Sequence, residues 1–154
     1  MSLEVGDKAP NFNLPTDGGG NISLKDLKGE TVILYFYPKD DTPGCTKEAC
    51  GFRDALPDFS KVKATVIGVS KDPVKKHEEF KDKYDLTFPL ASDEDGAVCE
   101  AYGAWVEKSM YGRKYMGIDR STFLIDGKGV IRGIWRKVKV PGHVDEVLKA
   151  TQDL

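Results

Sequence analysis

An apolar run at residues 31–37 is the feature that most limits how this chain can fold. Nearly every residue in it is a strand former, which is the pattern of a central β-strand covered on both faces. The run leads into Pro38, Pro43 and Gly44, which cannot extend a strand, and then into helix-compatible sequence. The sequence therefore predicts a buried strand, a short loop and a helix that begins near Cys45.

A cysteine at the start of a helix is expected to be reactive. The first N–H groups of a helix have no intrahelical acceptor, and the helix dipole adds partial positive charge there, so an anionic side chain is stabilised. Thiols at such positions have pKa values of roughly 3.5–7.5, against about 8.5 for an ordinary thiol. The alternative is a buried and inert side chain, which is a common fate of free cysteines. The position of Cys45 after Thr42-Pro43-Gly44 favours the nucleophile.

Strands and helices alternate along the rest of the chain. The helix after Cys45 carries apolar residues at intervals of three or four, and Pro57 is expected to break or kink it. Residues 103–119, in which Tyr111 and Tyr115 lie among basic residues, are expected to be irregular or extended; RNA stacking and a solvated loop both remain open for them. The other predicted elements are a hairpin of residues 12–14 and 21–24, a strand over 64–70, a helix from Asp72-Pro73 to about Tyr84, a short strand over 86–90, a helix after Asp95-Gly96, a hairpin over 122–135 and a last helix after Pro141. This order predicts a single α/β domain over residues 3–154, with a mixed central sheet flanked by helices and an N-terminal hairpin.

The bulk composition is that of an ordinary globular protein. The chain has 154 residues, 40% hydrophobic and 31% charged, with a formal net charge of −2. A large basic field for nucleic acid is not expected, and no apolar run approaches the roughly 20 residues that cross a bilayer. The N-terminus lacks the apolar core of a signal peptide. We therefore expect a cytoplasmic protein that binds neither membrane nor nucleic acid.

Three cysteines, an odd number, argue against a secreted disulfide scaffold. Cys45 and Cys50 form a C-x4-C pair, which is neither the C-x2-C of dithiol reductases nor a usual zinc motif, and His77 and His143 lie in separate segments. No glycine-rich phosphate loop is present. We expect no metal and no cofactor, a structural Cys99 with a secondary redox role left open, and His77 in the core or a groove.

Several motifs, in the same order and over the full length, resemble the peroxiredoxins. They are the Pro38-x3-Thr42-x2-Cys45 signature, Cys50 five residues later, and the stretches over 6–12, 92–96 and 120–126. Together they resemble the Q-type, or bacterioferritin-comigratory-protein, class. The resemblance implies a thioredoxin-like fold and a thiol peroxidase that acts on hydrogen peroxide and organic hydroperoxides.

The resemblance also implies residue roles. Cys45 is expected to be the peroxidatic nucleophile and Cys50 the resolving thiol, with Arg120 fixing the thiolate and peroxide and Pro38 shielding the sulfur. Thr42 is expected to turn its hydroxyl to the same pocket, although a local turn bond to the backbone remains open. For Arg120 a surface salt bridge remains open as well. Glu48 matches an acidic residue of the class, or simply complements the helix dipole.

Helix geometry sets a condition on the two cysteines. Residues five apart on an intact helix point about 140° away from each other, with Cα atoms about 8.7 Å apart. A disulfide tolerates at most about 7 Å, so the first helix must unwind locally before Cys45 and Cys50 can join.

Peroxide is the expected substrate, and thioredoxin or a related dithiol protein is the expected reductant. The protein is expected to be a monomer. Two other functions remain open. A thiol–disulfide oxidoreductase normally needs the C-x2-C that this chain lacks. A non-enzymatic redox-sensing or holdase module needs only an exposed thiol, and so does not require Pro38, Thr42 and Arg120 together.

Overall fold

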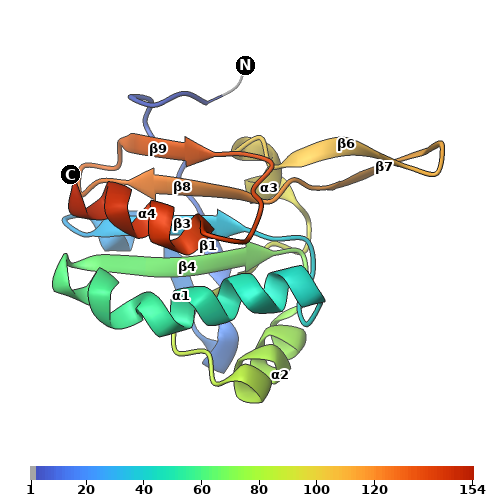
Figure 1. Cartoon of the computed structure of the whole chain (residues 1–154), viewed down its shortest axis with the longest axis horizontal. Helices are drawn as coiled ribbons and strands as arrows, with labels where there is room; N and C mark the ends of the chain where they lie inside the picture. The colour runs from blue at the N-terminus through green and yellow to red at the C-terminus, as the bar shows by residue number, and fades with distance from the viewer. Residues whose placement is uncertain (1–2) are drawn as a thin grey trace.

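The computed structural model describes residues 3–154 and has a central five-stranded sheet between two covering layers (Figure 1). In spatial order the strands are β5 (Leu90–Ser92), β4 (Ala64–Ser70), β3 (Thr31–Phe36), β8 (Ser121–Ile125) and β9 (Ile131–Trp135). The first two pairings are parallel and the last two antiparallel. The predicted mixed sheet is therefore confirmed, with the 31–37 run at its centre.

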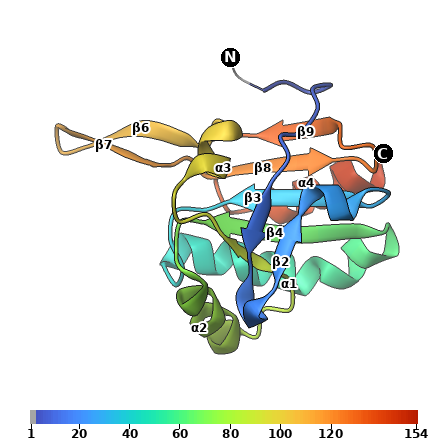
Figure 2. The same ribbon diagram turned by 180° about the vertical axis from the view of Figure 1, so that it is seen from behind.

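Helices cover one face, and the other face lies under an N-terminal hairpin and one short helix (Figures 1 and 2). The helices are α1 (Pro43–Lys61), α2 (Val74–Tyr84), α3 (Ala97–Ala101) and α4 (His143–Gln152). The hairpin consists of β1 (Asn13–Pro15) and β2 (Asn21–Ser23), paired antiparallel as predicted. α1 and α4 lie side by side on the first face, and α2 packs at the β5 edge.

The central strand β3 contributes side chains to two separate hydrophobic cores, because successive side chains of a strand point to opposite faces of the sheet. Ile33, Tyr35 and Tyr37 belong to the core under α1 and α4. Leu34 and Phe36 belong to the core under the β1–β2 hairpin and α3. All five side chains are almost completely buried, which explains why the run is apolar in both registers.

Pro57 lies inside α1, and the helix continues to Lys61, so of the expected break or kink the break is wrong. A proline removes one backbone hydrogen bond and costs about 3 kcal/mol in a helix interior. The residues on either side of it, Phe52 and Phe59, are fully buried against the sheet and α4. Burying such side chains contributes about 1.5–3 kcal/mol each, enough to hold the helix together across the proline.

Two predictions around α2 and β5 are also wrong in detail. α2 begins at Val74 after Pro73, and the Asp72 side chain does not cap it. Instead, Asp72 Oδ2 accepts hydrogen bonds from the Asp40 N–H (2.8 Å) and from Ser70 Oγ (2.7 Å). The strand expected at 86–90 begins only at Leu90, because Pro89 has no N–H to donate to β4.

Residues 103–119 form a regular hairpin of β6 (Trp105–Met110) and β7 (Arg113–Ile118), so the extended alternative is confirmed and the irregular one is wrong. Tyr111 and Gly112 join the strands with φ values of 51° and 78°. Positive φ at both positions is the mark of a type I′ turn, in which glycine or asparagine is usual and tyrosine is not. The hairpin projects away from the body of the molecule (Figures 1 and 2).

The antiparallel pairing of β3 with β8 brings two distant segments to one edge of the sheet. Phe36, the last residue of β3, pairs with Ser121, the first residue of β8. The loop from β3 to α1 therefore starts beside Arg120, 75 residues from Cys45 along the chain. Across residues 3–154, no helix is long and apolar enough to cross a membrane.

Candidate active site

Cys45 lies in the first turn of α1, as the sequence predicts. Thr42 occupies the N-cap position with extended backbone, and Pro43 is the first helical residue. The first hydrogen bond of the helix runs from the Thr46 N–H to the Thr42 carbonyl (2.8 Å). The N–H groups of Gly44 and Cys45 precede that bond, so by position they have no acceptor within the helix. They leave partial positive charge beside the Cys45 sulfur.

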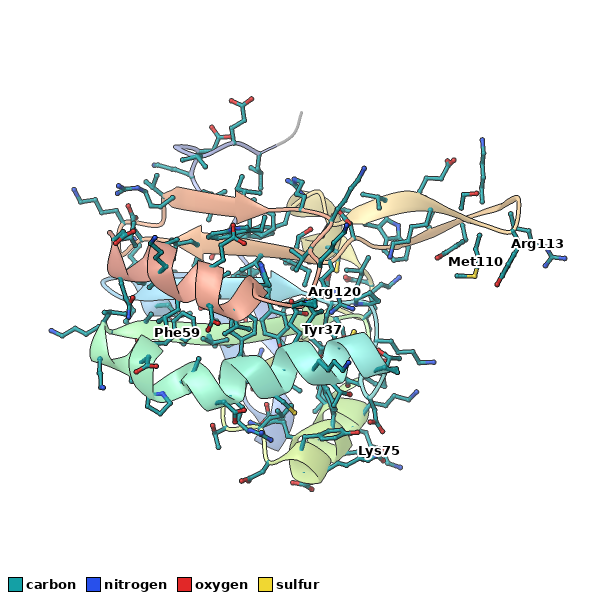
Figure 3. All side chains as sticks on the ribbon, in the orientation of Figure 1. Tyr37, Phe59, Lys75, Met110, Arg113 and Arg120 are labelled. Atoms are coloured by element: carbon teal, nitrogen blue, oxygen red, sulfur yellow. The ribbon has the colours of Figure 1, made fainter. Side chains whose placement is uncertain are left out.

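Arg120 brings a full positive charge to the same sulfur. Its Nη2 donates to Cys45 Sγ at 3.4 Å, and in Figure 3 its side chain lies beside the start of α1. Gly44 leaves room for this approach, since a Cβ there would lie 3.2 Å from Nη2. Cys45 is only 1% exposed, so little water screens the contact between the guanidinium and the sulfur.

Glu48 is the site residue that the sequence reasoning undervalued. It is fully buried one turn after Cys45, and its Oε1 accepts a hydrogen bond from Arg120 Nη1 at 2.7 Å. Burial raises the pKa of this carboxyl group to about 7, although Arg120 acts in the opposite direction. The sequence pattern could have predicted this contact. Glu48 lies on the same inward face of the helix as Cys45, Ala49 and Phe52, and a buried carboxylate there needs a partner.

Arg120 is charged in this setting. Burial lowers its pKa, but Glu48 and Cys45 raise it by more, and the net shift is upward. The guanidinium thus serves two acceptors with different nitrogens, which fixes its plane as well as its charge. This geometry differs from the surface salt bridge that was the alternative, because the Arg120 side chain is only 16% exposed and Glu48 not at all.

Two buried oxygen atoms near this cluster lack a hydrogen-bond partner within residues 3–154: Glu48 Oε2 and the Tyr35 hydroxyl. Burial raises the pKa of Tyr35 well above its usual value, and the charges of Glu48 and Cys45 raise it further. The hydroxyl therefore stays protonated. The floor of the site thus contains spare hydrogen-bonding capacity that the side chains themselves do not use.

Thr42 and Pro38 lie in the loop that leads to α1. The Thr42 hydroxyl donates to the Lys39 carbonyl (2.9 Å), which is the turn bond that the sequence left open. Because its proton is committed there, only its lone pairs remain for an incoming ligand. Pro38 is exposed at the start of the loop, directly after the buried Tyr37.

Cys50 lies in the same helix as Cys45 and is half-buried, and all three cysteines of the chain are free. With α1 intact from Pro43 to Lys61, the two Cα atoms are about 8.7 Å apart by helix geometry. No disulfide can span that distance. The helix therefore holds this pair of thiols apart.

Cys99 lies on the opposite face of the sheet, in α3, and is fully buried. Burial raises the pKa of its thiol, and a hydrogen bond with Asp93 raises it further, so the sulfur stays protonated.

Residues 3–154 contain no cluster of three or more His, Cys, Asp or Glu side chains that could hold a metal ion. The site is a thiol beside a cation, and its chemistry is nucleophilic attack by sulfur.

Comparisons with known proteins agree with this chemistry. Residues 5–134 match the AhpC/TSA family model. A putative peroxiredoxin bcp from Coxiella burnetii is 64% identical, covering 96% of this chain and 98% of the relative. A cysteine-to-serine variant of PrxQ from Xylella fastidiosa superposes with a TM-score of 0.94 at 43% identity, over 99% and 98% of the two chains. Bacterioferritin comigratory protein from Xanthomonas campestris, studied for its alkyl peroxide reduction activity, superposes with a TM-score of 0.89 at 46% identity, over 92% and 90%.

Proposed function

Since the chain belongs to the AhpC/TSA family and is a peroxiredoxin, we propose that it reduces hydrogen peroxide and alkyl hydroperoxides through Cys45 and Cys50. The observation that carries the proposal is the 3.4 Å contact between Arg120 Nη2 and the buried Cys45 sulfur at the start of α1. The alkyl peroxide reduction named for the Xanthomonas campestris protein supports the wider substrate range.

In the first step, the Cys45 thiolate attacks one oxygen of the peroxide. An S–O bond forms, the O–O bond breaks, and the departing alkoxide or hydroxide takes up a proton from solvent. Cys45 becomes a sulfenic acid. Negative charge moves from sulfur to the leaving oxygen, and the Arg120 guanidinium with the free N–H groups at the start of α1 stabilises it along that path. The Thr42 hydroxyl donates to the Lys39 carbonyl, and we propose that its lone pairs accept the hydrogen bond of a peroxide O–H.

In the second step, the Cys50 thiol attacks the sulfenic sulfur, water leaves, and a Cys45–Cys50 disulfide forms. This step requires residues 45–50 to leave the helical conformation, because the helix holds the two Cα atoms too far apart. Both thiols belong to one chain, so a monomer suffices. Cys99 is unsuited to replace Cys50, since it is buried on the other side of the sheet.

A dithiol protein then returns the disulfide to two thiols by thiol–disulfide exchange. We propose thioredoxin for this role in a cytoplasmic setting, where it keeps thiols reduced. We also propose that Pro38, which is exposed at the start of the loop, shields the sulfur and offers no N–H to compete for the peroxide.

A coupled assay tests the proposal. NADPH oxidation is followed with thioredoxin and its reductase, using hydrogen peroxide and an alkyl hydroperoxide in turn. The parental chain and Cys99→Ser should turn over, Cys45→Ser should be inactive, and Cys50→Ser should form sulfenic acid once without thioredoxin-dependent turnover. Stoichiometric peroxide consumption by the parental chain would instead indicate a redox sensor, and insulin reduction without peroxide turnover would indicate a thiol–disulfide oxidoreductase. Full turnover by Cys50→Ser would move resolution to another thiol.

A further inference from the structure

The loop that leads to Cys45 is anchored by a buried side chain with no part in the chemistry described above. Asp40 lies between Pro38 and Thr42 and is 8% exposed. Its Oδ1 accepts a hydrogen bond from the Tyr37 hydroxyl (2.5 Å), and its Oδ2 lies 2.7 Å from His77 Nδ1. Its backbone N–H donates to Asp72 (2.8 Å). A carboxylate held in this way cannot move without leaving several buried groups unpaired.

His77 fixes the other end of this contact. It is fully buried in α2, and its Nε2 lies 3.0 Å from the Ala91 carbonyl, which can only accept. Nε2 therefore carries a proton. The remaining nitrogen, Nδ1, faces the Asp40 carboxyl group, so one proton is shared between the two residues. The pair as a whole is neutral, whether the proton lies on the ring or on the carboxyl, and this avoids the cost of an isolated buried charge.

A second bridge joins the same loop to the far end of α2. Asp41 Oδ2 accepts from Lys83 Nζ (2.8 Å) and its Oδ1 from the Tyr84 hydroxyl (2.7 Å). Asp41 has a positive φ of 58°, which is uncommon outside glycine and shows how tightly the loop turns. The two adjacent aspartates thus tie the loop to both ends of one helix, the first by a buried contact and the second by an exposed one.

We propose that His77 is a positioning residue, which acts through Asp40 to hold the Thr42 hydroxyl where the peroxide must bind. The proposal deepens the peroxidase function proposed above and rests on it. His77 touches neither the sulfur nor the substrate. Its effect is geometric, because Thr42 takes its orientation from the Lys39 carbonyl, and Lys39 directly precedes the anchored Asp40. Small errors in such placement are costly, since about 1 Å of misplacement can reduce a rate about 100-fold.

The anchor has a second consequence for the step in which α1 unwinds. Asp40 and Asp41 stay tied to α2, which is outside the unwinding segment, so the chain is hinged between Thr42 and Cys50. After reduction, the first turn re-forms against a loop that has not moved. His77 therefore preserves the peroxide pocket through the catalytic cycle.

The test compares two reactions of the same sulfur. Oxidation of Cys45 by hydrogen peroxide needs a positioned substrate, whereas alkylation by iodoacetamide needs only the thiolate. His77→Phe keeps a ring and removes both hydrogen bonds; its oxidation should be 10–100-fold slower while its alkylation stays within twofold of the parental rate. Tyr37→Phe removes the hydroxyl that donates to Asp40 and lies 3.4 Å from His77 Nδ1, and its oxidation should be a few-fold slower. Phe59→Leu, a buried change at the far end of α1, is the control for lost stability and should leave both rates within twofold.

Amide hydrogen exchange of residues 39–42 provides a readout that does not depend on the chemistry. It should be faster in His77→Phe than in the parental chain, because the Asp40 N–H contact to Asp72 is released. A His77→Phe chain that oxidises at the parental rate overturns the proposal, and so does one whose oxidation and alkylation fall together. If His77→Phe does not fold, parental oxidation in Tyr37→Phe overturns it. If the proposed peroxidase function itself is wrong, the parental chain will not be oxidised at Cys45. That result is distinct from the outcomes that overturn the role of His77.

Discussion

Arg120 Nη2 lies 3.4 Å from the Cys45 sulfur, while Nη1 of the same guanidinium lies 2.7 Å from a carboxylate oxygen of Glu48. The cation is therefore shared by a reactive sulfur and by a buried acid. Removing either acceptor changes what the cation offers to the other, which makes the three side chains one electrostatic unit.

Replacement of Arg120 should slow the chemistry much more than it destabilises the fold. Loss of one positioned donor typically costs about 2.7–4 kcal/mol, or about 100–1000-fold in rate. We expect Arg120→Met to slow Cys45 oxidation by that factor in stopped-flow measurements. Glu48, whose pKa is already about 7 beside Arg120, should stay protonated at pH 6 without its partner, so the melting temperature at pH 6 should change little. Arg132→Met, at an exposed ion pair beyond the other end of β8, is the control and should react at the parental rate. A folded Arg120→Met chain with the parental oxidation rate contradicts the role of Arg120.

The stability of the chain should contain two opposing pH dependences. Burial raises the pKa of Glu48 from 4.5 to about 7, so its contribution is present below pH 4.5 and is lost as the pH rises through 7. Burial lowers the pKa of His143 from 6.5 to about 4, so its contribution is present above pH 6.5 and is lost as the pH falls through 4. Each shift corresponds to about 3 kcal/mol at 1.36 kcal/mol per pH unit.

Urea unfolding at a series of pH values can separate these two contributions. Glu48→Gln should show stability that rises more steeply than in the parental chain between pH 4.5 and 6.5, because only the His143 contribution remains. His143→Gln should show a steeper fall between pH 4.5 and 7. The same slope in Glu48→Gln and the parental chain would show that the pKa of Glu48 is not raised.

Local sequence patterns predicted most of the fold, because the periodicity of buried strands and amphipathic helices depends on residues that are close together in the chain. The central strand, the 64–70 strand and the last hairpin follow from that. The β6–β7 turn could not be predicted from Tyr111, because tyrosine rarely adopts a positive φ by itself. Here the pairing of the two strands stabilises that conformation. The break expected at Pro57 does not occur for a related reason: burial of Phe52 and Phe59 outweighs the lost backbone hydrogen bond.

The site was predicted in part. The motif around Cys45 and the resemblance carried by residues 120–126 point to Cys45 and Arg120, and the structure brings the two together. The contact of Glu48 with Arg120 and that of Asp40 with His77 span 72 and 37 residues. Such contacts depend on the register of β8 beside β3 and on where α2 packs, neither of which can be derived from one sequence.

Gly51 should control how readily α1 opens. Glycine weakens a helix interior by about 0.8–1.0 kcal/mol relative to alanine, so Gly51→Ala should slow disulfide formation relative to sulfenic acid formation and leave more Cys45 open to overoxidation. The structure adds a complication: a Cβ at this position would lie 3.1 Å from Val144 Cγ2 of α4. The clean comparison is therefore Gly51→Ala/Val144→Ala against Val144→Ala, with both rates followed by quenched-flow mass spectrometry. Equal rates of disulfide formation in these two chains would contradict a role for Gly51.

Amide hydrogen exchange across residues 45–52, compared between the reduced chain and the chain oxidised by one equivalent of hydrogen peroxide, tests whether α1 must unwind before Cys45 and Cys50 join. The Cys45–Cys50 bond is verified by mass spectrometry in the same sample, and residues 143–152 of α4 serve as the internal reference. We predict faster exchange across 45–52 in the oxidised chain, reversed by a dithiol reductant, with little change in α4. Identical exchange in the two forms, with the Cys45–Cys50 bond present, would contradict the requirement that α1 unwinds.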